Sequence, residues 1–164
     1  MPEHALGDQL RNIVKSVEVR LEKTTDTEAG RKPYSGKWSK KEVIGHLVDS
    51  AINNQGRFIT AQVNEDMIFA GYDQEFWVQT QNYESYHWPQ LIQLWKSLNL
   101  HLARIIDEIS LETLNRQRKN HNLDKIAWKP VDSSSPTTLW YFIQDYMRHL
   151  EHHLKQVFPD YLPP

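Results

Sequence analysis

Hydrophobic residues recur every three or four positions in four stretches of the chain, which is the spacing that places them on one face of a helix. The first stretch predicts a helix over residues 5–23, with apolar positions Leu6, Leu10, Ile13, Val14, Val17 and Leu21. The second predicts a helix from Ser39 to about Val63, with apolar positions Val43, Leu47, Ala51, Phe58 and Ala61. Glu42 follows Ser39 by three residues, the spacing of a capping box that satisfies free amides at a helix start. The polar Asn54 lies on the apolar face of this helix.

The third stretch has the most regular pattern and begins at Trp88-Pro89, where proline is accepted in a first helical turn. Its apolar positions are Leu91, Leu94, Trp95, Leu98, Leu102, Ile105 and Ile109. The fourth stretch follows Pro136 and ends before Pro159, with apolar positions Leu139, Phe142, Ile143, Tyr146, Leu150 and Val157.

The connections between these helices are long. Residues 24–37 are rich in Thr, Gly and Pro and read as a connector, whereas residues 64–86 carry large aromatic side chains and predict a packed loop with a helical turn. Residues 111–136 predict a long connection that includes a short pair of extended segments. No convincing run of alternating polar and apolar residues predicts a sheet. The pattern therefore predicts an all-α fold, a four-helix bundle with long crossover connections.

Composition narrows the class of protein further. The chain has 164 residues, 39% of them hydrophobic, which is enough for one core and predicts a single domain over residues 1–164. The formal net charge of −2 does not favour binding to a polyanion such as nucleic acid. No stretch is apolar for the roughly 18 residues that a membrane span needs, and the start MPEHALGDQL lacks the features of a secretory signal. We expect a cytoplasmic protein that binds neither nucleic acid nor membrane.

Histidine is the residue type that points to chemistry. The chain has eight His and no Cys, so a metal would be held by His, Asp or Glu. His149 and His153 in HLEHH lie four residues apart, one helical turn, at the border of the apolar stripe. His46 has the same kind of position on the second predicted helix. If the two helices pack side by side, three neutral imidazoles can bind one divalent ion and leave positions open for water or substrate.

A second interpretation of these histidines stays open at this point. A pair four residues apart arises by chance in a chain with eight His, and histidines at the edge of a core can simply form hydrogen bonds. The spacing also does not show that two helices meet. The run is not the HExxH of zinc proteases, because Leu150 follows His149 and Glu151 points to another side of the helix.

Two blocks of the sequence resemble the DinB/YfiT-like superfamily of metal-binding four-helix bundles. They are GKWSKKEVIGHLVDSAINNQGRF, residues 36–58, and YMRHLEHHLKQV, residues 146–157. Trp-Ser comes before a helix with one histidine, and the last helix carries His-x-x-His-His followed by Gln. GYDQEFW, residues 71–77, resembles one subgroup more loosely. Where many relatives have Arg-Gly before this Gln, the chain has Leu154-Lys155, so a substrate contact by that turn is not carried over.

The resemblance implies a metal triad of His46, His149 and His153 that holds a divalent ion, zinc or nickel, with open positions. It implies a metal-dependent enzyme acting on a small molecule, either a hydrolase or an S-transferase that uses a low-molecular-weight thiol. The alternative is a non-catalytic metal-binding module or a dimeric interaction module, since relatives often form homodimers. No residue is assigned here as a catalytic acid or base.

Three residues on the polar flank of the second helix are further candidates. Asp49 lies three residues after His46 and can orient a metal-bound imidazole or water, or it can be a solvated carboxylate. Asn53 and Arg57 can contact a polar or anionic substrate, although an ordinary salt bridge explains Arg57 equally well. Four aromatic residues after the second helix, the last of them at the start of the third, can line a pocket or simply pack: Tyr72, Trp77, Tyr83 and Trp88.

Overall fold

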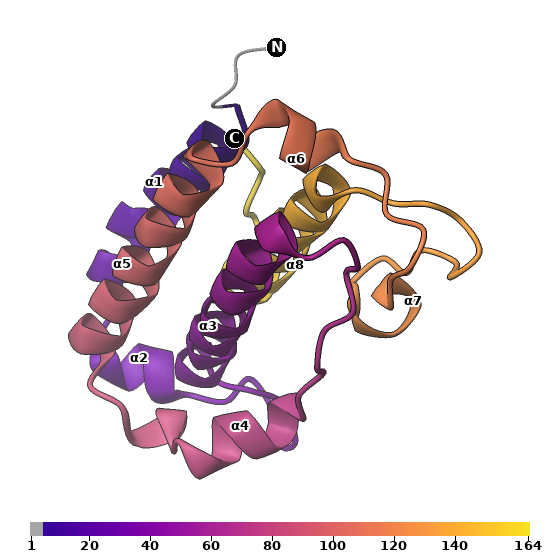
Figure 1. The fold of residues 1–164 in the computed structure, drawn as a ribbon. Coiled ribbons are helices and arrows are strands. Elements are labelled where there is room, and N and C mark those ends of the chain that lie inside the picture. The colour runs from indigo at the N-terminus through magenta and orange to yellow at the C-terminus, as the bar shows by residue number, and fades with distance from the viewer. Residues whose placement is uncertain (1–4) are drawn as a thin grey trace.

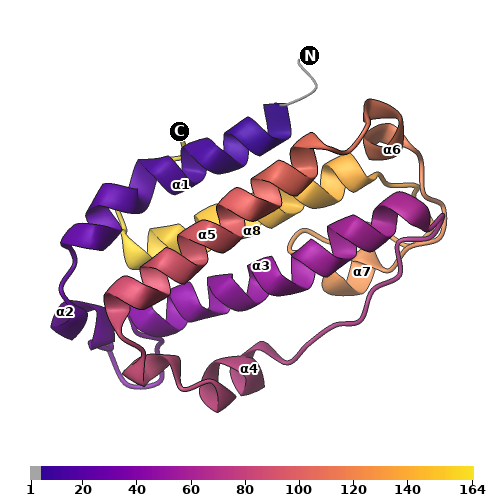
Figure 2. The ribbon, with the colours of Figure 1, turned by 60° about the vertical axis from the view of Figure 1, so that its left-hand side comes forward.

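A computed structural model describes residues 5–164 and contains four long helices. They are α1 (Ala5–Lys23), α3 (Lys40–Val63), α5 (Trp88–Asp107) and α8 (Leu139–Val157). The helix α3 packs against both α5 and α8, while α1 packs mainly against α5 (Figures 1 and 2). No strand is present in residues 5–164, so the predicted all-α four-helix bundle is confirmed. None of the helices in this part of the chain is long and apolar enough to cross a membrane.

The helix boundaries follow from local chemistry that the sequence displays. The capping box forms as predicted: Ser39 Oγ accepts from the Glu42 amide at 3.3 Å, and Glu42 Oε2 accepts from the Ser39 amide at 2.8 Å. Thr138 Oγ1 accepts from the Tyr141 amide at 3.1 Å and begins α8 in the same way. The predicted apolar stripe of the third helix runs to Ile109, whereas α5 ends at Asp107.

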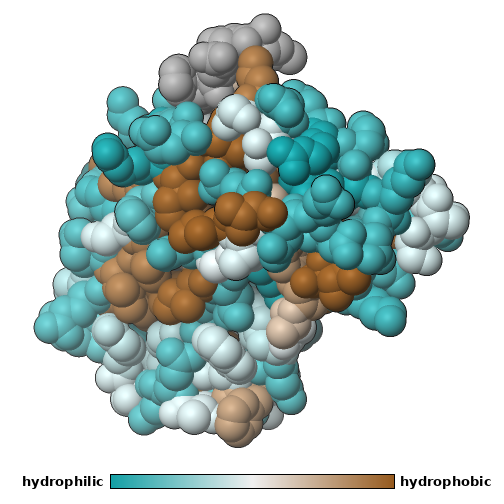
Figure 3. All heavy atoms as spheres, in the orientation of Figure 1, coloured by the Kyte–Doolittle hydropathy of each residue, from teal (hydrophilic) through white to brown (hydrophobic). Residues whose placement is uncertain are grey.

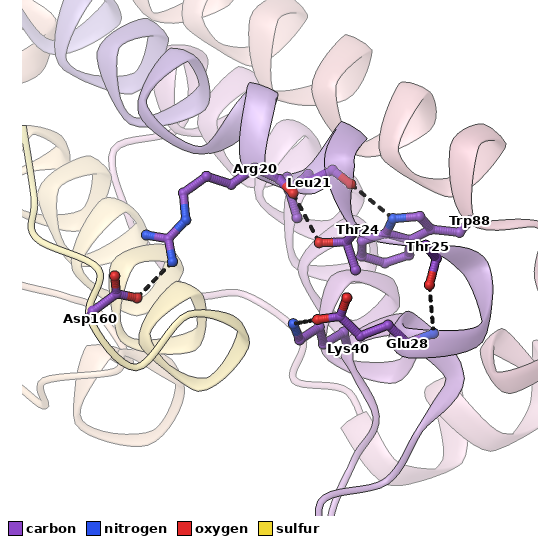
Figure 4. Close-up of polar contacts among 8 residues, drawn as sticks. All are labelled: Arg20, Leu21, Thr24, Thr25, Glu28, Lys40, Trp88 and Asp160. Atoms are coloured by element: carbon purple, nitrogen blue, oxygen red, sulfur yellow. Dashed lines mark hydrogen bonds and ion pairs between the residues drawn. The ribbon is translucent and has the colours of Figure 1, made fainter.

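The connector over residues 24–37 contains a short helix, α2 (Asp26–Gly30), that the prediction lacks. Its start is capped by Thr25, whose Oγ1 accepts from the Glu28 amide at 3.2 Å (Figure 4). Two further contacts in Figure 4 join this end of the bundle: Lys40 Nζ donates to Glu28 Oε1 at 2.8 Å, and Trp88 Nε1 donates to the Leu21 carbonyl at 3.0 Å. The first of these contacts joins α2 to the first residue of α3, and the second joins α5 to the end of α1.

The two later connections are folded against the bundle. Residues 64–86 include α4 (Gln74–Thr80) and the 3-10 turn η1 (Tyr83–Ser85), in agreement with the predicted loop and helical turn. Residues 111–136 include α6 (Leu111–Asn115) and α7 (Leu123–Ile126). The extended pair predicted there is wrong as a strand pair, because the backbone forms only an isolated bridge between Arg118 and Thr137 and another between Met67 and His121.

Arg118 ties the third of these connections to the end of α3. Its side chain is 2% exposed, and the guanidinium donates to the Ala61 carbonyl at 2.9 Å, the Glu65 carbonyl at 2.9 Å and the Asn64 carbonyl. The last carbonyls of a helix have no partner within the helix and carry its negative dipole end. A buried cation therefore closes the C-terminal end of α3.

Candidate metal centre

Three histidine side chains from two helices meet in one place. His46 comes from the second turn of α3, and His149 and His153 come from consecutive turns of α8. Nε2 of His149 lies 3.2 Å from Nε2 of His46 and 3.1 Å from Nε2 of His153. One ligand atom from each residue lies within 4.8 Å of the others. The packing of α3 against α8 thus supplies the meeting of helices that spacing alone could not show.

Burial keeps these imidazoles neutral. His46 and His153 are buried and His149 is half-buried. Burial, followed by repulsion from the neighbouring rings, lowers the pKa of His46 to about 3 and the pKa of His149 to about 2. Burial also lowers the pKa of His153. A neutral imidazole has a free lone pair, which is the form that binds a metal.

The spacing of the nitrogens agrees with three ligands on one ion. Two nitrogens bound at about 2.1 Å are about 3.0 Å apart at a right angle and about 3.4 Å apart at the tetrahedral angle. The distances of 3.1 and 3.2 Å fall between these values. Gln156 adds to the fit, because its Oε1 lies 2.9 Å from His153 Nδ1 and accepts the proton there. That bond leaves the lone pair of His153 on Nε2, facing the other rings.

Asp49 is buried, which excludes the solvated interpretation. Its Oδ1 accepts from Tyr83 Oη at 2.7 Å and from Gln81 Nε2 at 2.8 Å, and burial raises the pKa of its carboxyl. Asp49 Oδ2 is buried without a partner, and so is His46 Nδ1, three positions earlier on the same helix. Two buried polar atoms without partners, so close along one helix face, are unusual in a native protein.

Asn53 and Arg57 differ in what they contact. Asn53 Nδ2 donates to the Asp49 carbonyl at 2.8 Å, a bond within α3, and Asn53 does not line the cavity described below. The adjacent Asn54 does line it. Arg57 is buried and donates to the Ala70 carbonyl at 2.6 Å. The salt-bridge interpretation of Arg57 is wrong within the described residues, where it forms no ion pair.

A cavity of about 250 Å³ opens beside His46 and His149 and extends along α3 to Arg57. Of the four aromatic residues proposed for a pocket wall, Tyr72 lines it, Trp77 packs on Tyr72 with ring centres 5.2 Å apart, and the other two are buried in the core: Tyr83 and Trp88. The remaining aromatic walls come from residues that the sequence did not single out for this purpose: Trp128, Phe142 and Tyr146.

Trp128 is held at the cavity by Asp145 of α8. The Asp145 carboxylate accepts from the backbone amide of Trp128 at 2.7 Å and from that of Lys129 at 2.8 Å. The indole then lies over His152 and beside His149, with ring centres 4.4 and 5.6 Å apart. One sequence signal for this contact exists, because Asp145 is a carboxylate one helical turn before His149, among the apolar positions of its helix.

Tyr83 reaches Asp49 only because α3 carries glycine at position 45. A Cβ at Gly45 would overlap the Tyr83 ring, while a Cβ at Gly56 would meet nothing within 4 Å. We expect Gly45→Ala to lower the free energy of unfolding by about 1–3 kcal/mol through overpacking. Gly56→Ala, the matched control, is expected to raise it by roughly 0.5–1 kcal/mol through helix propensity. Urea unfolding measures both, and a Gly45→Ala protein as stable as wild type would contradict the placement of Tyr83.

Comparison with known proteins agrees with this architecture. The solved structure of YfiT from Bacillus subtilis, described as "a probable metal-dependent hydrolase with an unusual four-helix bundle topology", matches with a TM-score of 0.75 and 18% identity. The match covers 96% of this chain and 84% of YfiT. No curated protein sequence matches the chain. A sequence model of the DinB superfamily matches residues 9–157, so the chain belongs to the DinB superfamily.

Proposed function

We propose that the protein is a metal-dependent hydrolase that holds one divalent ion, zinc or nickel, with His46, His149 and His153. The observation that carries the proposal is the convergence of three neutral imidazoles at 3.1–3.2 Å beside a cavity. Three protein ligands leave positions open on the ion, as catalytic sites require and structural sites do not. The description of YfiT as a metal-dependent hydrolase supports the same class of reaction.

The chain's own residues prepare this site for chemistry. An ion bound there would lower the pKa of a water molecule and supply a nucleophile at neutral pH. Gln156 holds the proton on His153 Nδ1, so the Nε2 lone pair stays directed at the centre. Trp128, held by Asp145, packs beside His149 at the edge of the cavity. The cavity admits a small substrate next to the imidazoles.

Metal analysis followed by an activity panel tests the proposal. Protein purified without chelator is expected to carry about one divalent ion per chain and to hydrolyse members of a panel of small esters and amides. The ions are then removed with chelator, and activity should be lost and return on adding zinc or nickel. A parallel assay with a low-molecular-weight thiol and an electrophile tests for S-transferase activity. The chain has no Cys, so the thiol must come from solution. Bound metal without activity in either assay would instead favour the non-catalytic module.

Asp49 is proposed to orient His46, by accepting a hydrogen bond from its Nδ1. Within residues 5–164, His46 Nδ1 and Asp49 Oδ2 are both buried and neither has a hydrogen-bond partner, so a bond between them would satisfy both. We expect Asp49→Asn to weaken zinc affinity by about ten- to a hundredfold, the usual cost of losing a ligand's outer partner. Glu65→Gln removes an equal charge from an exposed site and should leave affinity unchanged. Competition with a chromophoric chelator measures both, and equal affinities for Asp49→Asn and wild type would remove Asp49 from the site.

The homodimer and the cytoplasmic location stay predictions. Exposed apolar side chains support a dimer, because Ile52 and Ile59 on α3 are 44% and 46% exposed and lie two turns apart. Figure 3 shows hydrophobic side chains gathered in several groups among hydrophilic ones on the face seen in Figure 1.

A further inference from the structure

The cavity beside His46 and His149 contains a buried cation, Arg57, that forms no ion pair with any carboxylate of residues 5–164. We propose that this cavity binds a small organic acid, with the carboxylate on Arg57 and the reacting end of the molecule at His46 and His149. The inference rests on the proposed function, because it names the substrate class of that site.

Arg57 is the residue that carries the inference. Its side chain is 9% exposed and lines the cavity. Its one short hydrogen bond is to the Ala70 carbonyl at 2.6 Å, and the contact with Asn54 Oδ1 is long, at 3.5 Å. By contrast, the buried Arg118 has three backbone carbonyls as partners. A guanidinium has five N–H donors and stays protonated in proteins, so Arg57 keeps both charge and donors for a ligand.

The other charged groups of the cavity leave its balance positive. Lys125 lies in the wall and is exposed to solvent. Asp145 is the acidic residue there, and both of its oxygens accept backbone amides, from Trp128 and Lys129. With Arg57 and Lys125 against Asp145, an anion is favoured even before a divalent ion adds its charge. Two parallel N–H donors of one guanidinium match a carboxylate.

The shape of the cavity separates the two ends of the proposed ligand. His46 and Arg57 are eleven positions apart on α3, about 16 Å along the helix axis at 1.5 Å per residue. The lining is mixed: Ser50 and Asn54 of α3 lie between the two ends, and four aromatic side chains complete the wall: Tyr72, Trp128, Phe142 and Tyr146. A volume of about 250 Å³ admits only a small molecule. These features fit a small organic acid whose carboxylate and reacting group lie at opposite ends of the molecule.

Hydroxamates of dicarboxylic acids test the inference on the zinc-loaded protein. The probes are the monohydroxamates of succinic, adipic and suberic acid, each paired with the neutral alkyl hydroxamate of the same chain length. The hydroxamate binds zinc and the carboxylate reaches Arg57. We expect at least one acid to bind about ten- to a hundredfold more tightly than its neutral partner, the gain typical of a hydrogen bond to a charged group. Calorimetry measures the affinities, and Arg57→Met should abolish the difference.

The controls separate this inference from the proposed function. Arg104→Met removes an exposed cation of α5 that lies outside the cavity, and it should keep the full preference for the acid. Zinc content and thermal unfolding are measured for every variant; if Arg57→Met does not fold, Arg57→Lys is expected to keep the charge and part of the preference. A wild-type protein that holds zinc but binds acid and neutral probes equally overturns the inference alone, as does a preference that survives in Arg57→Met. A phosphonate analogue that binds more tightly than the carboxylate overturns the carboxylate assignment.

Failure to hold either zinc or nickel would contradict the proposed function, and metal analysis measures that result separately. In that case, binding of adipate to the metal-free protein tests whether the cavity is an anion site. Adipate binding that is lost in Arg57→Met supports an anion site, and adipate binding that does not depend on Arg57 overturns it.

Discussion

Replacing His149 by alanine is expected to abolish stoichiometric binding of a divalent ion. His149 Nε2 is the central atom of the cluster, 3.2 Å from His46 Nε2 and 3.1 Å from His153 Nε2, so its loss leaves two ligands with no third between them. The affinity should fall by more than the about ten- to hundredfold that loss of an outer partner costs. Metal content after dialysis and titration with zinc measure the change. The melting temperature of wild type should rise with added zinc, and that of His149→Ala should not.

His152→Ala is the matched control for this prediction. His152 is the same residue type on the same helix, next to His153 and in contact with the Trp128 ring, but it does not belong to the cluster. It should retain one ion per chain. Tight, stoichiometric metal in both His149→Ala and His153→Ala would contradict the proposed ligand set.

Replacing Arg118 by methionine is expected to lower the stability of the fold substantially. Methionine keeps much of the volume but leaves the carbonyls of Ala61, Asn64 and Glu65 without their charged donor at the C-terminal end of α3. Hydrogen bonds to a charged group contribute about 1.5–3 kcal/mol each and are not additive, so we expect a loss of about 2–4 kcal/mol. For a domain of ordinary stability, about 5–15 kcal/mol, this is a large fraction.

Urea unfolding in the presence of chelator measures the effect of Arg118→Met without a contribution from metal. Arg116→Met removes an exposed charge two residues earlier and should change stability by less than about 0.5 kcal/mol. Arg118→Lys keeps the charge but not the planar set of donors, and should fall between the two. If Arg118→Met were as stable as Arg116→Met, the cap on α3 would have no energetic role.

Periodicity predicted α1, α5 and α8 well because each buries mainly one apolar face, whereas residues 41–51 of α3 are buried on all sides. The stripe of α1 matches its bounds at Ala5 and Lys23, and the capping box marks the start of α3. The short helices have no such face. The helix α2 depends on a cap at Thr25 and on packing against α3 and α5, and the connection that holds α6 and α7 is anchored by Arg118. Contacts between distant segments decide these elements, and a local pattern does not contain them.

The same distinction applies to the candidate site. The histidine pair of α8 follows from helical spacing, whereas the approach of His46 to this pair depends on how α3 packs against α8. Gln156 could have been found, because it lies three residues after His153 on the same helix, within reach of its ring. Trp128 could not, since its position depends on a loop that Asp145 holds.

The three histidines join positions 103 residues apart, His46 and His149. An unfolded chain keeps only the local pair on α8, so an ion held by all three residues would bind the folded protein far more tightly than the open one. The supply of metal would then influence how fast the protein is degraded. Proteases that cut transiently opened chains would remove protein without its ion first, and cells short of metal would contain less of the protein without any change in its synthesis.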